Sequence, residues 1–392
     1  MADPHGVVHL EQTNGPATHA LVVGIGRYPH LLGGESPSAS SDGMKQLSSP
    51  PVSARAFAAW LVAEYHHPAK PLGSVALLLS EESPPPFVNP RTGESAEVAE
   101  ATIANLTSAV EAWKGRGDAQ AQNRLVLYFC GHGISEGDDM ALLASDFDPD
   151  SGNPLNQALD FGRLRHGLKR CAASEQLFFV DACRASSDVL ISQAGAAFAG
   201  QVPLLPGMRP RELPRLLSVP YYATLAGDLS HARPGEVSLF TQALLRGLRG
   251  AGSDDPEGDW RVTTILLQQA IDHFMKQPMF AGKVAGVQVP VVGELPGFDL
   301  TELTAPPTVP VYVGCAPPDD NATAEFVCRR AGAECGRRAA DGADPADPVA
   351  EWSLDLPFGE YEFQATLGAG EVRSKSLMVR PAYRRITLGA QP

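Results

Sequence analysis

Two apolar runs of strand length, each followed at once by reactive side chains, constrain this chain more than any other feature. The run at 124–130 (RLVLYFC) leads directly into GHG, centred on His132, and the run at 177–180 (LFFV) leads into DAC, which ends at Cys183. Continuous apolar runs are typical of strands buried in a parallel sheet, and open α/β sheets place their chemistry at the carboxyl ends of the strands. The 51 positions that separate His132 from Cys183 leave room for a loop, a helix and a return strand. We therefore expect the imidazole and the thiol to lie side by side.

Strand-like and helix-like patterns alternate through most of the chain. Strand-like runs lie at 20–25, 75–79, 124–130, 176–181 and in the second half of 215–225, and helix-like periodicity lies at 54–65, 102–113, 159–168, 238–248 and 263–274. This alternation indicates βαβ units and predicts an α/β fold, an α/β/α sandwich with a mostly parallel central sheet. After residue 307 the pattern changes to short alternating runs between Gly and Pro signals, which predicts a small all-β, sandwich-like domain without a catalytic cluster.

Composition shifts and loop signals predict the boundaries between these parts. The segments are an N-terminal leader at 1–17, the sheet domain at 18–295, a linker at 296–307 and the β domain at 308–392. Within the sheet domain, a large part extends to about 185, a loop rich in Gly, Ala and Pro occupies 186–214, and a small part follows at 215–295. A second loop rich in Gly, Ser and Pro, at 33–51, is expected to be mobile.

Composition excludes several classes of protein. The net charge of −14 over 392 residues argues against nucleic acid as the main partner. No apolar run is long enough to cross a bilayer, and the first residues show no signal peptide, so we expect a cytoplasmic protein without a membrane partner. The six cysteines form no CxxC motif and should remain thiols in a reducing compartment, although Cys328 and Cys335 could pair in an oxidising one.

The pair His132 and Cys183 favours nucleophilic catalysis over a structural role. Either residue alone at a strand end is usually structural, but the two together, with glycines beside the histidine, indicate a Cys–His dyad. The histidine would take the thiol proton, and the thiolate would attack a carbonyl carbon. The resulting oxyanion needs aimed N–H donors, for which the backbone amides of Gly133 and Cys183 are the candidates. No cofactor or metal is required for this chemistry.

At this point the sequence resembles the caspase–metacaspase family of cysteine peptidases. Four stretches carry the resemblance, namely ALVVGIGRY at 20–28, YFCGHG at 128–133, FVDACRAS at 179–186 and LAGDLSHARPGEVSLFTQALLRGL at 225–248. The resemblance covers about 20–292 and implies a caspase-like fold. It implies that His132 is the general base and acid and that Cys183 is the nucleophile.

The resemblance also suggests a specificity. Asp181 occupies the position that in metacaspases helps to line the S1 pocket, whereas caspases that cleave after Asp have Gln there. A carboxylate pairs with Arg or Lys through charge-assisted hydrogen bonds. We therefore expect protein substrates with Arg, or Lys, at P1; the alternative is that Asp181 only holds a loop.

Several positions depart from the family pattern. Cys130 stands where Ser is usual, either as a near-site thiol or as a small packed residue, and Glu35 and Asp42 are no clear counterparts of the second S1 acid. Five acids crowd the segment after the histidine, at positions 138, 139, 146, 148 and 150. Asp146 is the one we single out, as a structural or substrate-site acid. The spacing of these acids is not that of an EF-hand loop. A solvated acidic loop and a Ca²⁺-binding segment are the two alternatives.

Control by proteolysis is a further expectation. The loop at 186–214 lies where family zymogens are processed, and Arg211 and Arg215 offer cleavage sites to the enzyme itself or to an upstream activating protease. Bacterial members of the family often serve in programmed cell death or antiviral defence. The alternatives to a peptidase are a degenerate caspase-like scaffold that binds a peptide without cutting it, and a transacylase or ligase that uses the same dyad.

Overall fold

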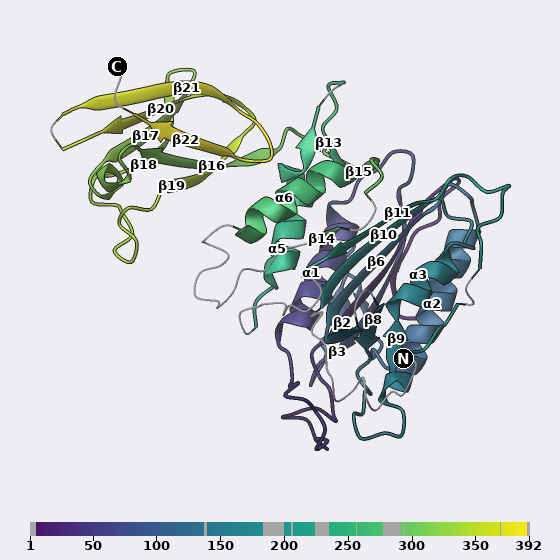
Figure 1. Cartoon of the computed structure of the whole chain (residues 1–392). Helices are drawn as coiled ribbons and strands as arrows, with labels where there is room; N and C mark the ends of the chain where they lie inside the picture. Colours follow the sequence, from purple (N-terminus) through teal and green to yellow (C-terminus); the bar gives the residue numbers. More distant parts are fainter. Residues whose placement is uncertain are drawn as a thin grey trace. The chain divides into compact units, whose positions relative to one another are not determined.

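A mostly parallel sheet with helices on both faces forms the first part of the chain (Figure 1). The structure is a computed structural model, and it describes residues 5–136, 139–182, 200–204, 207–223, 235–255, 257–276, 291–292, 295–368 and 370–389. The strands of the sheet are β1 (Val7–Leu10), β2 (Thr18–Ile25), β3 (Leu72–Ser80), β6 (Arg124–Gly131), β10 (Glu175–Ala182), β11 (Leu217–Tyr222) and β14 (Val291–Val292). Their order is β1-β3-β2-β6-β10-β11-β14, with the two outermost strands antiparallel to their neighbours and the rest parallel. The predicted α/β class is confirmed.

The helices of this part cover the sheet from opposite sides. They are α1 (Ser49–Ala63), α2 (Ile103–Asp118), α3 (Phe161–Leu168) and α5 (Leu239–Arg246). Leu127 and Phe178 belong to one buried cluster with Trp113 of α2 and Leu164 of α3. On the other face, the ring of Phe57 in α1 stacks on that of Tyr128, with centroids 4.8 Å apart. Because adjacent residues of a strand point to opposite faces, the continuous apolar runs supply both layers of core.

Smaller strands extend the sheet domain beyond its carboxyl edge. β7 (Gly133–Glu136) follows His132 immediately and pairs with β8 (Asp139–Leu143), which pairs with β9 (Ala158–Asp160). A two-stranded hairpin of β4 (Phe87–Val88) and β5 (Ser95–Ala96) lies in the predicted loop between β3 and α2.

Two predictions about the first sixty residues were wrong. The expected leader contains β1, which pairs with β3, because Val8 can bury its side chain against the sheet. The first helix starts five residues earlier than predicted, since Pro50 and Pro51 fit the first turn, where no N–H donor is needed. The hydroxyl of Ser53, within this helix, accepts a hydrogen bond from the backbone N–H of Ser238 at 2.9 Å.

The chain divides into two compact units. The first comprises Met1–Leu245 and Ile271–Gly297, and the second comprises Arg246–Ala270 and Phe298–Pro392. The division runs through α6 (Thr264–Lys276). The segment predicted as a linker contains β15 (Asp299–Glu302), which pairs with β13 (Arg261–Thr263) and through it with β12 (Ser253–Asp254). The expectation of a bare linker was wrong because Leu300 and Thr301 are buried in this pairing.

The second unit contains the predicted β-sandwich. Its strands are β16 (Thr308–Cys315), β17 (Glu325–Arg330), β18 (Ala333–Arg338), β19 (Trp352–Pro357), β20 (Gly359–Thr366), β21 (Val372–Val379) and β22 (Arg384–Leu388). They form the sheets β19-β16-β22 and β18-β17-β20-β21, which share one apolar core. The sulfurs of Cys328 and Cys335 lie 3.2 Å apart across the β17–β18 hairpin as free thiols.

No helix within the described part of the chain has the length and apolar character needed to cross a membrane.

Candidate active site

The register of two central strands places His132 and the residue that precedes Cys183 at one edge of the sheet. β6 and β10 are parallel, and Gly131 is the partner of Ala182 at their carboxyl ends. His132 is the next residue after Gly131, and Cys183 is the next residue after Ala182. Neighbouring strands lie about 4.8 Å apart, so β6 and β10 end at the same level of the sheet. Cys183 lies outside the described residues, and its role as nucleophile and oxyanion donor stays a prediction.

His132 is held by contacts from two segments that precede α1. It is 9% exposed, and its backbone N–H donates to the hydroxyl of Tyr28 at 2.9 Å. The rings of Tyr28 and His132 pack with centroids 4.9 Å apart. On the other side of the imidazole, Nε2 lies 2.7 Å from the backbone carbonyl oxygen of Lys45. The ring is therefore fixed by packing and by a hydrogen bond before any substrate arrives.

The Lys45 contact determines which ring nitrogen can accept a proton. A carbonyl oxygen only accepts hydrogen bonds, so Nε2 must carry the hydrogen and Nδ1 is the basic nitrogen of the neutral ring. Burial lowers the pKa of His132, while the Lys45 carbonyl opposes this by favouring the protonated ring. The net effect keeps His132 neutral at pH 7, which is the form a general base requires.

The loop that carries Lys45 is held in place by one amide side chain. Gln46 Nε2 donates to the carbonyl oxygen of Tyr28 at 2.8 Å, and Gln46 Oε1 accepts from the Tyr28 backbone N–H at 2.7 Å. A bridge between Leu32 and Lys45 closes the loop. The sequence prediction missed both the Lys45 carbonyl and this brace, because a backbone acceptor leaves no mark in residue type. Tyr28 was present in the resemblance but had no assigned role.

Asp181 lies at the end of β10 in a buried group of hydroxyls. It is 2% exposed and is paired in register with Cys130 of β6. Its carboxylate accepts a hydrogen bond from the hydroxyl of Ser238, and another from Thr241 Oγ1 at 2.9 Å. The Thr241 hydroxyl lies in turn 2.6 Å from that of Tyr128. The α5 end and β10 together hold this carboxylate two residues before Cys183.

Cys130 is a packed thiol beside this carboxylate. Burial raises its pKa well above the ordinary value, and the negative charge of Asp181 raises it further. The thiol therefore stays protonated at neutral pH and is a poor nucleophile. Of the two interpretations of Cys130, the packed small residue fits this environment.

The remaining glycine of the predicted site begins a strand. Gly133 is the first residue of β7 and is the register partner of Leu142 in β8. Its amide as an oxyanion donor stays a prediction.

Three of the acids after His132 make structural contacts. Asp146 Oδ1 accepts from the backbone N–H of Ile103 at 2.9 Å, at the start of α2, which is a structural contact; its role in substrate binding stays a prediction. Asp148 accepts from the Ser38 hydroxyl at 2.8 Å, and Asp150 accepts from backbone N–H groups of the same loop. Asp138 lies outside the described residues. Across the ranges that the structure describes, no group of three or more His, Cys, Asp or Glu side chains could hold a metal ion.

The predicted processing sites lie on the surface. Arg211 and Arg215 are exposed, in irregular chain just before β11. Arg209 ties this segment down by donating to the carbonyl oxygens of Cys171, at 2.7 Å, and Pro214, at 2.8 Å. Much of the predicted loop at 186–214, namely 186–199 and 205–206, lies outside the described residues.

A comparison with known protein families covers most of the sheet domain. Residues 17–290 match the family model of the caspase domain, Peptidase C14. The chain belongs to the caspase domain family. This is a family of caspase-like cysteine peptidases, and the resemblance seen in the motifs is thereby confirmed. The match ends close to residue 295, where the sequence predicted the end of the peptidase domain.

Two curated relatives are similar to about half of this chain. An uncharacterized protein of Sinorhizobium fredii is 34% identical over 210 residues, which are 53% of this chain and 58% of the relative. A probable protease of a Desulfuromonadales bacterium is 29% identical over 197 residues, which are 47% of this chain and 22% of the relative. The chain thus spans less than two thirds of the length of either relative. Among solved structures, caspase-1 from Spodoptera frugiperda aligns with a TM-score of 0.40 and 14% identity, over 74% of this chain and 94% of that one.

Proposed function

We propose that this caspase domain is a cysteine endopeptidase that hydrolyses peptide bonds after Arg or Lys, with Cys183 as nucleophile and His132 as base. The observation that carries the proposal is the Nε2 contact with the Lys45 carbonyl at 2.7 Å. That contact leaves Nδ1 as the proton acceptor on a neutral ring at the end of β6, one strand away from the position where β10 leads into Cys183.

The proposed reaction follows the order of acyl transfer to a thiol. His132 Nδ1 takes the proton of the Cys183 thiol, and the thiolate attacks the scissile carbonyl carbon. The amides of Gly133 and Cys183 are the proposed donors to the oxyanion. The imidazolium then gives its proton to the leaving amine, the C–N bond breaks, and a thioester remains. Water, deprotonated by the same histidine, hydrolyses the thioester and restores the thiol.

Asp181 is the proposed acid for a basic P1 side chain. Its position two residues before the nucleophile and its fixation by Ser238 and Thr241 support this assignment, because a preoriented carboxylate pairs strongly with a guanidinium or ammonium group. A structural role limited to binding the start of α5 is the alternative, and substrate selectivity distinguishes the two.

The proposal includes activation by cleavage after Arg211 or Arg215, by the enzyme itself or by an upstream protease. The exposure of both residues supports it. We further propose a cytoplasmic enzyme of bacterial defence or programmed cell death, which rests on the sequence prediction alone. Full activity of the intact chain, with no cut between 186 and 216, would refute the activation step.

The test is a panel of fluorogenic peptides that differ only at P1, with Arg, Lys, Asp or Ala. The proposal expects release from Arg and Lys, and none from Asp, by the wild-type chain and no release by Cys183→Ala. If no peptide releases its fluorophore even after controlled cleavage in the 200–215 segment, the scaffold alternative is favoured. Transfer of the acyl group to a labelled amine would favour the transacylase.

A further inference from the structure

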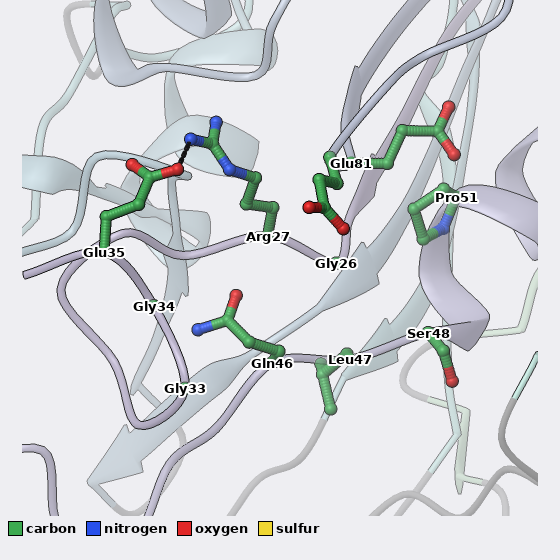
Figure 2. Close-up of a pocket in the computed structure, with 11 residues that line it drawn as sticks. Gly26, Arg27, Gly33, Gly34, Glu35, Gln46, Leu47, Ser48, Pro51 and Glu81 are labelled. Carbon is green, nitrogen blue, oxygen red and sulfur yellow. Dashed lines mark hydrogen bonds and ion pairs between the residues drawn. The ribbon is translucent and has the colours of Figure 1, made fainter. Parts of the chain in front are cut away.

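A cavity of about 460 Å³ opens beside the candidate active site, at the carboxyl ends of β2 and β3 (Figure 2). Its walls come from the residues after β2, the loop at 33–35, the segment 46–51 at the start of α1, and the two glutamates that follow β3. Such a volume accommodates one long side chain together with part of a peptide backbone. No step of the proposed reaction uses this space.

The polar lining of this cavity is mainly negative. Glu35, Glu81 and Glu82 contribute three carboxylates, against the single guanidinium of Arg27. Arg27 is already paired with Glu35, and Figure 2 shows it between Glu35 and Glu81. The Glu35 hydrogen bond raises the pKa of Arg27, and the charge of Glu82 contributes to the same rise.

One of the three carboxylates is left for a ligand. Glu81 is held 2.5 Å from Arg55, a residue of α1 that does not line the cavity, and Glu35 is held by Arg27. Glu82 is exposed, and the residues that the structure describes give it no hydrogen-bond or ion-pair partner. A cavity with a negative balance and an available carboxylate favours a cationic side chain.

The cavity and His132 share their supporting segments. Arg27 lines the cavity and precedes Tyr28, whose hydroxyl accepts from the His132 backbone. Gln46 lines the cavity and follows Lys45, whose carbonyl meets the imidazole. Across the sheet edge the order is therefore the cavity at β3 and β2, His132 at β6 and Cys183 after β10.

This order indicates which part of a substrate reaches the cavity. In hydrolysis by a histidine-assisted nucleophile, the histidine protonates the leaving amine. The segment after the scissile bond therefore departs on the histidine side, toward β2 and β3. The segment before the bond stays attached to the cysteine, on the side of β10.

We propose that this cavity is a subsite for a basic side chain located after the scissile bond, within the leaving segment of the substrate. The subsite rests on the proposed peptidase function. It adds a second preference for positive charge, on the opposite side of the cleaved bond from Asp181. Substrates with basic residues on both sides of the cut would thus be favoured.

Cleavage and binding test this subsite separately. Internally quenched peptides with P1 Arg would carry Lys, Gln or Glu in turn at the first three positions after the scissile bond. We expect kcat/KM to be highest with Lys at one of these positions. In Glu82→Gln the Lys-to-Glu ratio of kcat/KM should fall by about two- to fivefold, the range for a partly exposed ion pair, and the wild-type preference should weaken with added salt.

The matched control is Glu111→Gln, which removes the same charge from an exposed position of α2 outside the cavity. The ratio should not change in this variant. A ratio that is the same in wild type and Glu82→Gln, or that falls equally in Glu111→Gln, would overturn the subsite.

A binding measurement tests the subsite independently of peptidase activity. Fluorescence anisotropy of labelled leaving-segment peptides, with Lys or Glu, would be measured on Cys183→Ala and on Cys183→Ala with Glu82→Gln. Lys-selective binding that depends on Glu82 would support the subsite even if no peptide were cleaved. Cleavage after Arg without any such selectivity would retain the proposed function and reject the subsite.

Discussion

Buried polar groups have different kinds of partner at the two ends of the strand pair β6 and β10. At the start of β6 and β10, Arg124 and Glu175 are register partners, and their side chains form an ion pair at 2.7 Å. Lys70 also pairs with Glu175, and Tyr65 accepts a hydrogen bond from Arg124 at 3.0 Å. At the other end, Asp181 is bound by hydroxyls and His132 by a carbonyl. Opposite charges are matched at the first edge, whereas neutral groups orient the polar side chains at the second.

This contrast follows from what each edge must do. A buried charge is tolerated when a partner compensates its lost hydration, as at the Arg124 end. A general base must stay neutral and available, and an acid that binds a basic substrate must keep its charge for that substrate. The amino edge thus contributes to stability, and under the proposed function the carboxyl edge is arranged for chemistry. Four predictions test this comparison.

The largest effect is expected from His132→Ala. Loss of the general base should lower kcat/KM by about 10²- to 10⁴-fold, while the melting temperature should remain close to that of the wild type. Peptide turnover and thermal unfolding measured on the same preparations check both parts. Unfolding of the variant at much lower temperature would mean that His132 is as structural as Arg124.

Substitution at the amino edge should have the opposite profile. Glu175→Ala leaves the guanidinium of Arg124, whose side chain is 1% exposed, without its carboxylate. The free energy of unfolding should fall by roughly 3–5 kcal/mol, as measured by urea denaturation. The control Arg163→Ala removes an ion pair whose arginine is 54% exposed, and it should cost at most about 1 kcal/mol. Equal losses in the two variants would contradict the comparison.

Asp181→Asn tests selectivity with little change of shape. The amide keeps the size of the carboxylate and removes its charge, so kcat/KM for P1 Arg should fall at least about tenfold relative to P1 Ala. The ratio between the two substrates corrects for any general loss of activity. An unchanged ratio would assign Asp181 to the structural alternative.

The smallest expected effect is a displaced pH profile. Burial lowers the pKa of His132 from 6.5, so the neutral ring persists as the pH falls to that value and is protonated only at lower pH. Activity should therefore be retained through pH 6.5, and the acid limb of kcat/KM should have its midpoint below it. A midpoint at or above 6.5 would show that the imidazolium is stabilised at the site.

The sequence predicted the five parallel strands of the central sheet well, and its two outer strands and the loops poorly. A continuous apolar run such as 177–180 indicates a strand that is buried on both faces of the sheet, and such a run is visible in the sequence itself. Pro50 and Pro51 were interpreted as loop residues, although the first turn of a helix accepts proline. β1 and β15 are too short to stand out from their surroundings, and their pairing depends on distant partners.

The sequence could predict those parts of the candidate site whose chemistry belongs to a particular type of side chain. His132, Cys183 and Asp181 stand out by type and by their positions at strand ends. The Lys45 carbonyl could not be found in this way, because every residue has a carbonyl and only the path of the loop brings this one to the imidazole. Asp146 was conspicuous in sequence for its acidic neighbours, but its contact with Ile103 belongs to the start of α2.

The most direct test of the account is covalent labelling of the thiol. Matched chloromethyl ketone peptides with P1 Arg or P1 Asp would be incubated with the wild-type chain and with His132→Ala, and the modified residue would be located by peptide mass spectrometry. The account predicts that the P1 Arg reagent labels Cys183 rapidly, that the P1 Asp reagent does so poorly, and that His132→Ala slows the reaction strongly. Labelling of a different cysteine, or faster labelling by the P1 Asp reagent, would contradict it.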